Sequence, residues 1–140
     1  MVKIFLDSNI VVSYFTKRDQ SQFEIVTSVI DKIRLGKIIP YTSAIVFLEI
    51  FYVMVSVYKY DKKLVLEALN KFMRLRNLVM IEKTDVDLSL EYCKKYNIKL
   101  SDCFIAAQVP EGVKLFTFDR EFGKIPFLEL VHLNEIIGTT

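Results

Sequence analysis

The sequence predicts an α/β domain with a central, mostly parallel sheet of four to five strands and helices on both faces. Short apolar runs rich in β-branched and aromatic residues alternate along the chain with longer segments whose apolar residues recur at three- and four-residue steps. Strands separated by helices throughout are typical of parallel βαβ units. The length of 140 residues suits one domain with a sizeable core, so we expect residues 1–140 to form a single domain.

The first predicted strand contains Val2 and residues 4–6, where β-branched and aromatic residues dominate. It ends at the carboxylate of Asp7. Ligands of open α/β sheets bind beyond the carboxyl ends of the strands, so Asp7 lies where a functional site is expected. The alternative is that Asp7 or Ser8 only caps the following helix, as short polar side chains often do.

Two helices are predicted next. Residues 10–15 form an apolar run that suits a short packed helix, and residues 16–22 are polar and suit a loop or the start of another helix. Apolar residues then recur at helical spacing over residues 23–33, with polar residues on the opposite face. Gly36 occupies the position of a C-terminal cap, so we expect this second helix to end just before it.

A second strand and a very apolar helix follow. We expect the strand over residues 38–41, and Pro40 makes it an edge strand or marks the end of one. Thr42 or Ser43 then opens a helix that is almost entirely apolar over residues 44–55. A membrane span takes roughly 20 apolar residues and this run is shorter, so we interpret it as a core helix.

Glu49 lies near the middle of this apolar helix. Burying an ionised carboxylate without a partner costs on the order of several kcal/mol, so Glu49 must reach solvent, a cation or a metal ion. No residue nearby in the sequence supplies that cation. A position on the one exposed stripe of the helix is the alternative to a role in a site.

A helix, a strand and a further helix are predicted in the middle of the chain. Asp61 is expected to cap a helix whose apolar positions fall within residues 64–73, and residues 78–81 form the third strand. Thr84 followed by Asp87 resembles a capping box, which predicts that a helix starts there.

That helix is expected to end at Asn97, and another begins at Leu100 with Ser101 as its cap and Asp102 in its first turn. An acid in a first turn is stabilised by the helix dipole whether or not it has another role. The helix is expected to stop before Pro110, which cannot continue it.

The fourth strand is expected over residues 114–118, and it too leads directly into an acid, Asp119. The arrangement of the first strand and Asp7 is thus repeated near the end of the chain. A last strand over residues 128–133 and a short tail over residues 134–137 complete the predicted elements.

Composition and charge narrow the function classes. A hydrophobic fraction of 52% with 26% charged residues describes a globular protein, and a net charge of +2 is too small to indicate nucleic-acid binding by itself. Cys93, Cys103 and the single His132 do not support a zinc site or a disulfide framework. The chain passes from Met1 straight into a strand without the features of a signal peptide, so we expect a cytoplasmic protein that does not contact a membrane.

Four acids are placed where a parallel sheet could bring them to one edge: Asp7, Glu49, Asp102 and Asp119. In this order, and with the segments at 7–9 (Asp-Ser-Asn) and 117–122 (Thr-Phe-Asp-Arg-Glu-Phe), the chain resembles the PIN-domain ribonucleases. Among these it is most similar to the VapC-type toxins of toxin–antitoxin systems. The resemblance covers essentially the whole chain, in length as well as in motif order.

The resemblance implies a single PIN-like domain and a catalytic, metal-binding role for the four acids. It also implies RNA cleavage that leaves 5′-phosphate and 3′-hydroxyl ends, and a protein antitoxin as a partner. The chain departs from the family at residues 108–112, where related chains often continue the helix further, so the rim of the site is expected to differ there. The resemblance assigns supporting polar roles to Ser8, Asn9 and Thr117, names Glu121 as an alternative to Asp119, and leaves Arg120 as an RNA contact.

The residues themselves indicate the same chemistry. Carboxylate oxygens without His or Cys select hard cations, which predicts Mg²⁺ or Mn²⁺. Acids close together repel one another, and a divalent ion relieves that repulsion, lowers the pKa of a bound water and stabilises the charge that develops on an attacked phosphodiester. The sequence therefore predicts a Mg²⁺- or Mn²⁺-dependent endoribonuclease.

A homodimer is expected, because apolar residues are in excess over residues 45–55 and 64–73. Basic side chains would flank two acidic clefts and hold the phosphates of RNA, although such surface residues usually only aid solubility. The basic residues concerned are Lys59, Lys62, Lys63, Arg74, Arg76 and Arg120.

Other function classes fit less well. A phospho-acceptor receiver domain needs paired acids after the first strand, where this chain has Asp7 alone. A haloacid-dehalogenase-type phosphatase needs a second Asp two residues later, where this chain has Asn9. Phosphate-binding glycine loops are not indicated, since none of the four glycines cluster after a strand. A PIN-domain nuclease of housekeeping RNA processing and a non-catalytic acidic-pocket module for signalling or binding remain as alternatives.

Overall fold

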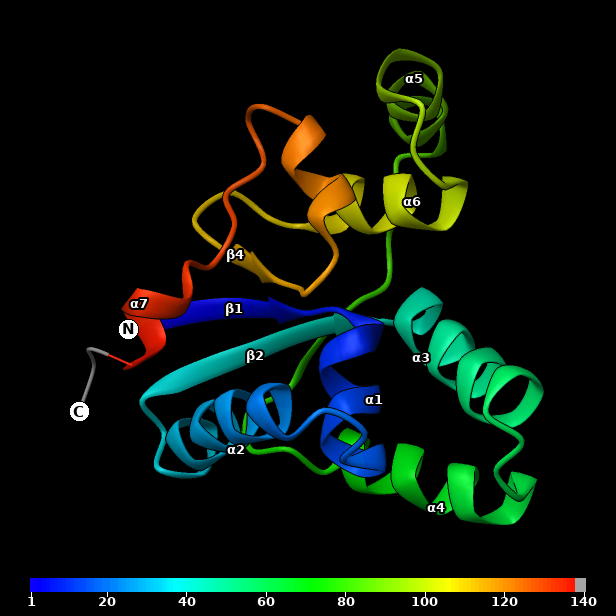
Figure 1. Ribbon diagram of the computed structural model, residues 1–140. Helices are drawn as coiled ribbons and strands as arrows, with labels where there is room; N and C mark the ends of the chain where they lie inside the picture. The colour runs from blue at the N-terminus through cyan, green and yellow to red at the C-terminus, as the bar shows by residue number, and fades with distance from the viewer. Residues whose placement is uncertain (138–140) are drawn as a thin grey trace.

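The computed structural model describes residues 1–137 and has a four-stranded sheet in the order β3-β2-β1-β4. Every pair of neighbouring strands is parallel. Figure 1 shows α1, α2 and α4 below the sheet and α5 and α6 above it. The predicted α/β architecture, with a parallel sheet between helices, is therefore confirmed. The strands are β1 (Val2–Leu6), β2 (Ile38–Ser43), β3 (Val79–Ile81) and β4 (Lys114–Phe116).

The helices connect these strands in the expected alternation. The predicted apolar helix over residues 44–55 is α-helical only to Phe51 and then continues as a π-helix, η1. No helix within residues 1–137 is both long enough and apolar enough to cross a membrane. The helices are α1 (Ser8–Thr16), α2 (Gln20–Arg34), α3 (Ala44–Phe51), η1 (Tyr52–Val57), α4 (Lys62–Met73), α5 (Val86–Tyr96), α6 (Leu100–Gln108), the 3-10 helix η2 (Arg120–Lys124) and α7 (Leu133–Ile137).

The core lies around β1, which has a strand on each side. Ile4, Phe5 and Leu6 are at most 2% exposed. Each such side chain contributes roughly 1.5–3 kcal/mol of burial free energy. The strand that carries Asp7 at its end is thus held firmly from both sides, and Asp7 has little freedom to move.

Pro40 does not place its strand at the sheet edge, so that prediction is wrong. β2 is an inner strand that pairs with β1 on one side and β3 on the other. However, β3 pairs only with Tyr41 to Ser43, whereas Pro40 is paired with Ile4 of β1. The proline therefore lies in the part of β2 that has a neighbour on one side only, where a missing N–H leaves no gap in the ladder.

The predicted last strand over residues 128–133 is also wrong. It is reduced to one parallel bridge between Leu115 and Leu130, and α7 starts already at Leu133. Two backbone hydrogen bonds hold it, from the Leu115 amide to the Glu129 carbonyl and from the Val131 amide to the Leu115 carbonyl. β4 is therefore paired along its 3 residues with β1 on one side and only at Leu115 on the other.

Helix caps were predicted correctly at three positions. Asp61 accepts a hydrogen bond from the Lys63 amide at the start of α4 (3.4 Å). Gly36 and Asn97 have the positive φ angles, 76° and 52°, that suit a helix end.

Two other predicted caps are wrong. Helix α5 is capped by Asp85, whose side chain accepts from the Leu88 amide (3.0 Å), and the Thr84 hydroxyl instead accepts from Gln108 of α6 (2.6 Å). Helix α6 starts at Leu100 as expected, but Lys99 is at the cap position, two residues before Ser101, and Ser101 lies inside the first turn.

Candidate active site

Asp7 and Thr117 meet because β1 and β4 are adjacent and in register. Leu6 pairs with Phe116, and the Asp7 amide donates to the Phe116 carbonyl (3.1 Å). The next residues of the two strands therefore lie side by side at the carboxyl edge of the sheet. β4 ends at Phe116, two residues before the predicted end, so Thr117 and Phe118 belong to the turn that follows.

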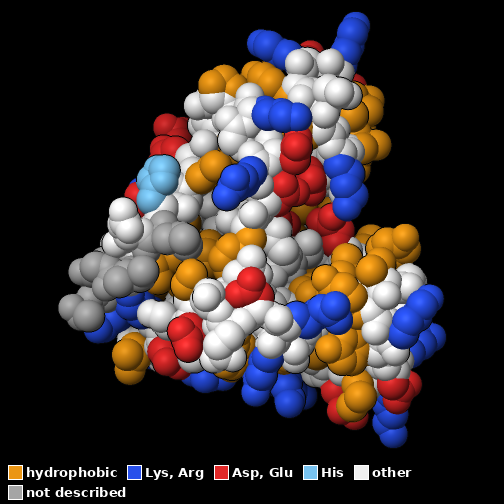
Figure 2. All heavy atoms as spheres, in the orientation of Figure 1, with side chains coloured by type: hydrophobic (Ala, Val, Ile, Leu, Met, Phe, Trp, Pro, Cys, Tyr) orange, Lys and Arg blue, Asp and Glu red, His pale blue; other side chains and the backbone are white. Residues whose placement is uncertain are grey.

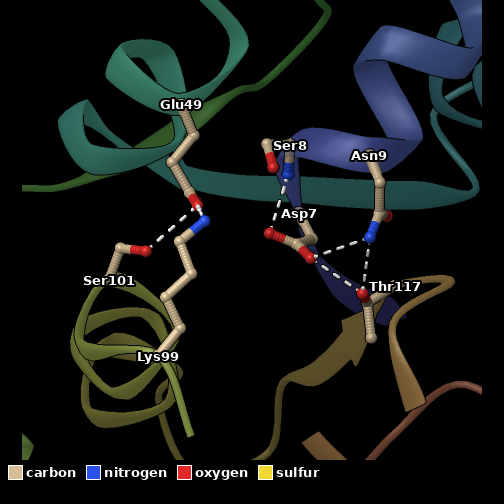
Figure 3. A network of polar contacts seen from close by, with 7 residues as sticks. All are labelled: Asp7, Ser8, Asn9, Glu49, Lys99, Ser101 and Thr117. Carbon is tan, nitrogen blue, oxygen red and sulfur yellow. Dashed lines mark hydrogen bonds and ion pairs between the residues drawn. The ribbon is translucent and has the colours of Figure 1, made fainter. Parts of the chain in front are cut away.

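Asp7 is buried, with 2% of its surface exposed, and its carboxylate accepts hydrogen bonds at both oxygens. The Ser8 amide donates to Oδ1 (2.8 Å). The Thr117 hydroxyl (2.7 Å) and the Asn9 amide group (3.3 Å) donate to Oδ2. Figure 3 shows these three groups around the carboxylate. Asp7 is thus both the cap of α1 and the centre of a polar network. A capping role and a place in a polar site, which the sequence presented as alternatives, are therefore compatible.

Asn9 and Thr117 fix the turn that carries Asp119. The Asn9 side chain donates to the Thr117 hydroxyl (3.1 Å) and accepts from the Phe118 amide (3.1 Å). The Thr117 hydroxyl in turn accepts from the Asp119 amide (3.0 Å). Asn9 and Thr117 thus join the Asp7 carboxylate to the turn that carries Asp119. Ser8 contributes its backbone N–H, since its hydroxyl has no hydrogen bond among the described residues.

The two acids of this turn differ in their surroundings. The Asp119 side chain caps η2 by accepting from the Glu121 amide (2.9 Å), and its charge raises the pKa of Asp7. The Glu121 carboxylate forms an ion pair with Lys124 (2.5 Å), one turn along η2. The surroundings thus favour Asp119 over Glu121 as the fourth acid. Arg120 is exposed beside them.

Glu49, which lies in an apolar helix, forms an ion pair with Lys99. Its side chain is 14% exposed, and its Oε2 accepts from Lys99 Nζ (3.3 Å) and from the Ser101 hydroxyl (3.2 Å). Its Oε1 is buried and has no hydrogen-bond partner within residues 1–137. Both partners come from the start of α6, which packs against α3.

The pairing with Lys99 was missed in the sequence because the partner lies 50 positions further on. The available signal was a lysine one helical turn before a candidate acid, Asp102, which places both side chains at the same end of α6. Although partial burial lowers the pKa of Lys99, the negative charges of Glu49, Asp102 and Asp7 hold it above its usual value.

Asp102 receives no hydrogen bond from the described residues. The residue is 7% exposed, and its carboxylate oxygens keep contact with solvent, unlike the buried Oε1 of Glu49. Burial, followed by the charges of Asp7, Glu49 and Asp119, raises the pKa of Asp102 to about 7, and Lys99 opposes that rise. Burial likewise raises the pKa of Asp7 to about 6, against the hydrogen bonds from Thr117 and Ser8. The fold has therefore brought the four predicted acids within electrostatic reach of one another.

The donors suit a hydrated divalent ion. Within residues 1–137, no group of three or more His, Cys, Asp or Glu side chains is arranged to hold a metal ion. Mg²⁺, however, usually keeps several waters and binds through one or two carboxylates. Among the described residues, Glu49 Oε1 has no hydrogen-bond partner and no group donates to Asp102, so both carboxylates have oxygens left for such an ion. Figure 2 shows acidic side chains gathered in a hollow of this face, with basic side chains beside them.

The PIN-domain family model matches residues 4–128, which include all four acids. The chain belongs to the PIN-domain family. No curated protein matches the sequence significantly.

Solved structures share the fold of this PIN domain. VapBC2 of Rickettsia felis, bound to a DNA fragment from its promoter, is 24% identical with a TM-score of 0.66, over 93% of this chain and 98% of that one. VapC20 of Mycobacterium tuberculosis, a toxin that cleaves the sarcin–ricin loop, is 14% identical with a TM-score of 0.67, over 91% and 98%. PAE2754 of Pyrobaculum aerophilum is 14% identical with a TM-score of 0.64, over 99% and 91%. At these identities the similarity concerns the fold.

Proposed function

We propose that this PIN domain is an endoribonuclease that depends on Mg²⁺ or Mn²⁺ and cleaves RNA phosphodiesters with an activated water. The observation that carries the proposal is Asp102, a buried carboxylate to which none of the described residues donates a hydrogen bond, within reach of three other acids. A cation beside such a group would favour its ionised form at neutral pH. The predicted ligands are Asp7, Glu49, Asp102 and Asp119.

Each residue of the site would have a separate role in this reaction. A bound divalent ion supplies an acidified water and charge stabilisation at the phosphodiester. The orientation of Asp7 is fixed by Asn9, Thr117 and the Ser8 amide. Asn9 and Thr117 also hold the turn after the adjacent strand β4, which carries Asp119. Arg120 is exposed next to these acids and would bind a phosphate of the RNA. The products would carry 5′-phosphate and 3′-hydroxyl ends.

We further propose that the protein is the toxin of a VapBC-type pair, with a protein antitoxin as partner. Support comes from the fold that it shares with VapBC2 and with the RNA-cleaving toxin VapC20. Because its proposed substrate is cellular RNA, we expect it to act in the cytoplasm. Housekeeping RNA processing is the second candidate. A neighbouring small gene for a DNA-binding antitoxin would favour the toxin, whereas an isolated gene would favour processing.

A homodimer is the third part of the proposal. Three large apolar side chains are exposed close together on α3, η1 and α6: Leu48 (70%), Tyr52 (63%) and Leu100 (43%). With neighbouring residues they line one hollow of about 410 Å³ that also contains Glu49 and Lys99. Exposed apolar patches of this kind often mark protein–protein interfaces.

Cleavage assays test the nuclease. The purified protein should cut RNA with Mg²⁺ or Mn²⁺ and stop in EDTA, and Asp7→Asn or Asp102→Asn should abolish cutting while the fold is kept. Asp87→Asn is the matched control, because Asp87 is also an acid in a first helical turn, that of α5. Undiminished cutting by both site variants would refute the mechanism, and a folded wild type that binds metal without cutting RNA would favour the non-catalytic alternative.

A further inference from the structure

Lys99 places a positive charge inside the acidic site. It is the cap residue of α6, three positions before Asp102, and its Nζ lies 3.3 Å from Glu49 Oε2. Figure 3 shows the side chain extending from the start of α6 to the carboxylate on α3. The ammonium therefore lies on the same carboxylate whose other oxygen, Oε1, is left for a metal ion.

The lysine can leave this position easily. Its side chain is 69% exposed, whereas that of Glu49 is 14% exposed. An exposed ammonium exchanges a carboxylate for water at small free-energy cost, because solvent screens the attraction. Departure of Lys99 would thus leave α6 and the rest of the fold in place.

Glu49 would remain oriented without Lys99. The Ser101 hydroxyl donates to the same Oε2 (3.2 Å), and Ser101 lies inside α6, whose position does not depend on the lysine side chain. The second oxygen, Oε1, is buried and has no partner in the described residues. The carboxylate is therefore held by one neutral donor, with capacity left for a cation.

We propose that Lys99 is the internal counterion of the metal-free site and that a divalent ion replaces it at Glu49. The inference rests on the proposed metal dependence. Two cations on one carboxylate repel each other, so Lys99 stabilises the metal-free protein and weakens metal binding. The opposite role, in which Lys99 helps to build the metal site, would make its loss weaken metal binding.

Calorimetric titration with Mn²⁺, without RNA and at low salt, tests the exchange. Lys99→Met keeps the aliphatic stem and removes the charge, and we expect it to bind Mn²⁺ about tenfold more tightly than the wild type. Lys99→Arg keeps a positive charge and should bind like the wild type. Lys94→Met is the matched control, since Lys94 is an exposed lysine on α5, and it should also bind like the wild type.

Thermal melts provide the second readout. In EDTA, Lys99→Met should melt below the wild type, and Mn²⁺ should raise its melting temperature by more. Unchanged or weaker Mn²⁺ binding by Lys99→Met would overturn the exchange and leave the proposed nuclease standing. A wild type and a Lys99→Met variant that both fail to bind Mn²⁺ would overturn the two together. Should Lys99→Met fail to fold, Lys99→Gln is judged by the same criterion.

Discussion

Two opposite effects act on the Asp102 carboxylate. The first turn of α6 favours a negative charge through the helix dipole. Burial and three neighbouring acids disfavour the negative charge, and they raise the pKa of Asp102 from the ordinary 3.8 to about 7. The folded protein therefore binds this proton more tightly than the unfolded chain does. Protonation of Asp102 therefore stabilises the folded protein relative to its ionised form. This stabilisation is fully present below about pH 4 and is lost as the pH rises to about 7.

Neutralising Asp102 should stabilise the metal-free protein where the acid is ionised. We predict that Asp102→Asn raises the melting temperature in EDTA at pH 8, and that the difference shrinks toward pH 5. Mn²⁺ should raise the melting temperature of the wild type more than that of the variant, by ligand linkage. The melting temperature of Asp7→Asn should rise by less than that of Asp102→Asn. Asp7 accepts three hydrogen bonds, and an amide retains only one acceptor oxygen.

Thermal melts at both pH values, with EDTA and with Mn²⁺, check this prediction, and Asp87→Asn on α5 serves as the control. If Asp102 only complements the helix dipole, its neutralisation should instead cost about 0.3–1 kcal/mol at both pH values. A loss of stability that does not depend on metal would rule out a shared site for Asp7 and Asp102.

Thr117 should affect the acid limb of the activity profile, where Asp7 and Asp102 both titrate. Its hydrogen bond lowers the pKa of Asp7, which stands at about 6. Thr117→Val removes that donor, so the Asp7 pKa should rise and the acid limb of kcat/KM should move to higher pH, with lower activity overall. Thr27→Val is the control, because the Thr27 hydroxyl only donates to the Phe23 carbonyl within α2. An unshifted profile would show that Asp7 is not the titrating group.

At the scale of single elements, the cap of α5 offers a direct test. The Asp85 carboxylate accepts from the Leu88 amide, so Asp85→Ala should cost about 1 kcal/mol of stability and speed hydrogen exchange at Leu88. Thr84→Val should leave exchange at Leu88 unchanged, since the Thr84 hydroxyl bonds to Gln108 instead. Faster exchange at Leu88 in Thr84→Val alone would support the capping box that the sequence suggested.

The elements that could be predicted from the sequence are those set by local patterns. The helical spacing of apolar residues was enough to predict α2 and α4, and a short run of β-branched and aromatic residues was enough to predict β1. The errors concern pairing between distant segments. Whether Pro40 has a second neighbour depends on how far β3 extends, and residues 128–133 meet β4 at one bridge only, from Leu130 to Leu115. Thr84 and Asp85 both fit a cap, and tertiary contact with α6 distinguishes them.

At the scale of the whole molecule, the positions of Asp7 and Asp119 were predictable because parallel strands end at one edge of the sheet. That rule places Asp7 next to the turn of Asp119 without any coordinates. The ion pair of Glu49 with Lys99 was not predictable in this way, because it requires knowing that α3 packs against α6. The sequence therefore predicted which acids meet, but not which cation they meet.

The same packing of α3 on α6 forms the apolar hollow proposed as the dimer interface. We predict that the wild type is a dimer at micromolar concentration and that Leu48→Glu makes it a monomer, because Leu48 is 70% exposed at the rim of that hollow. Leu90→Glu is the matched control on α5, 50% exposed, and should stay dimeric, whereas Leu64→Glu tests the second apolar stretch, on α4. Light scattering measures the mass of each protein. A monomeric wild type would refute the dimer, and a monomer from Leu64→Glu alone would move the interface to α4. Glu49 and Lys99 line the same hollow, and the 69% exposure of Lys99 is that of the single chain, so the Leu48→Glu monomer is the form in which Lys99 should leave Glu49 most easily.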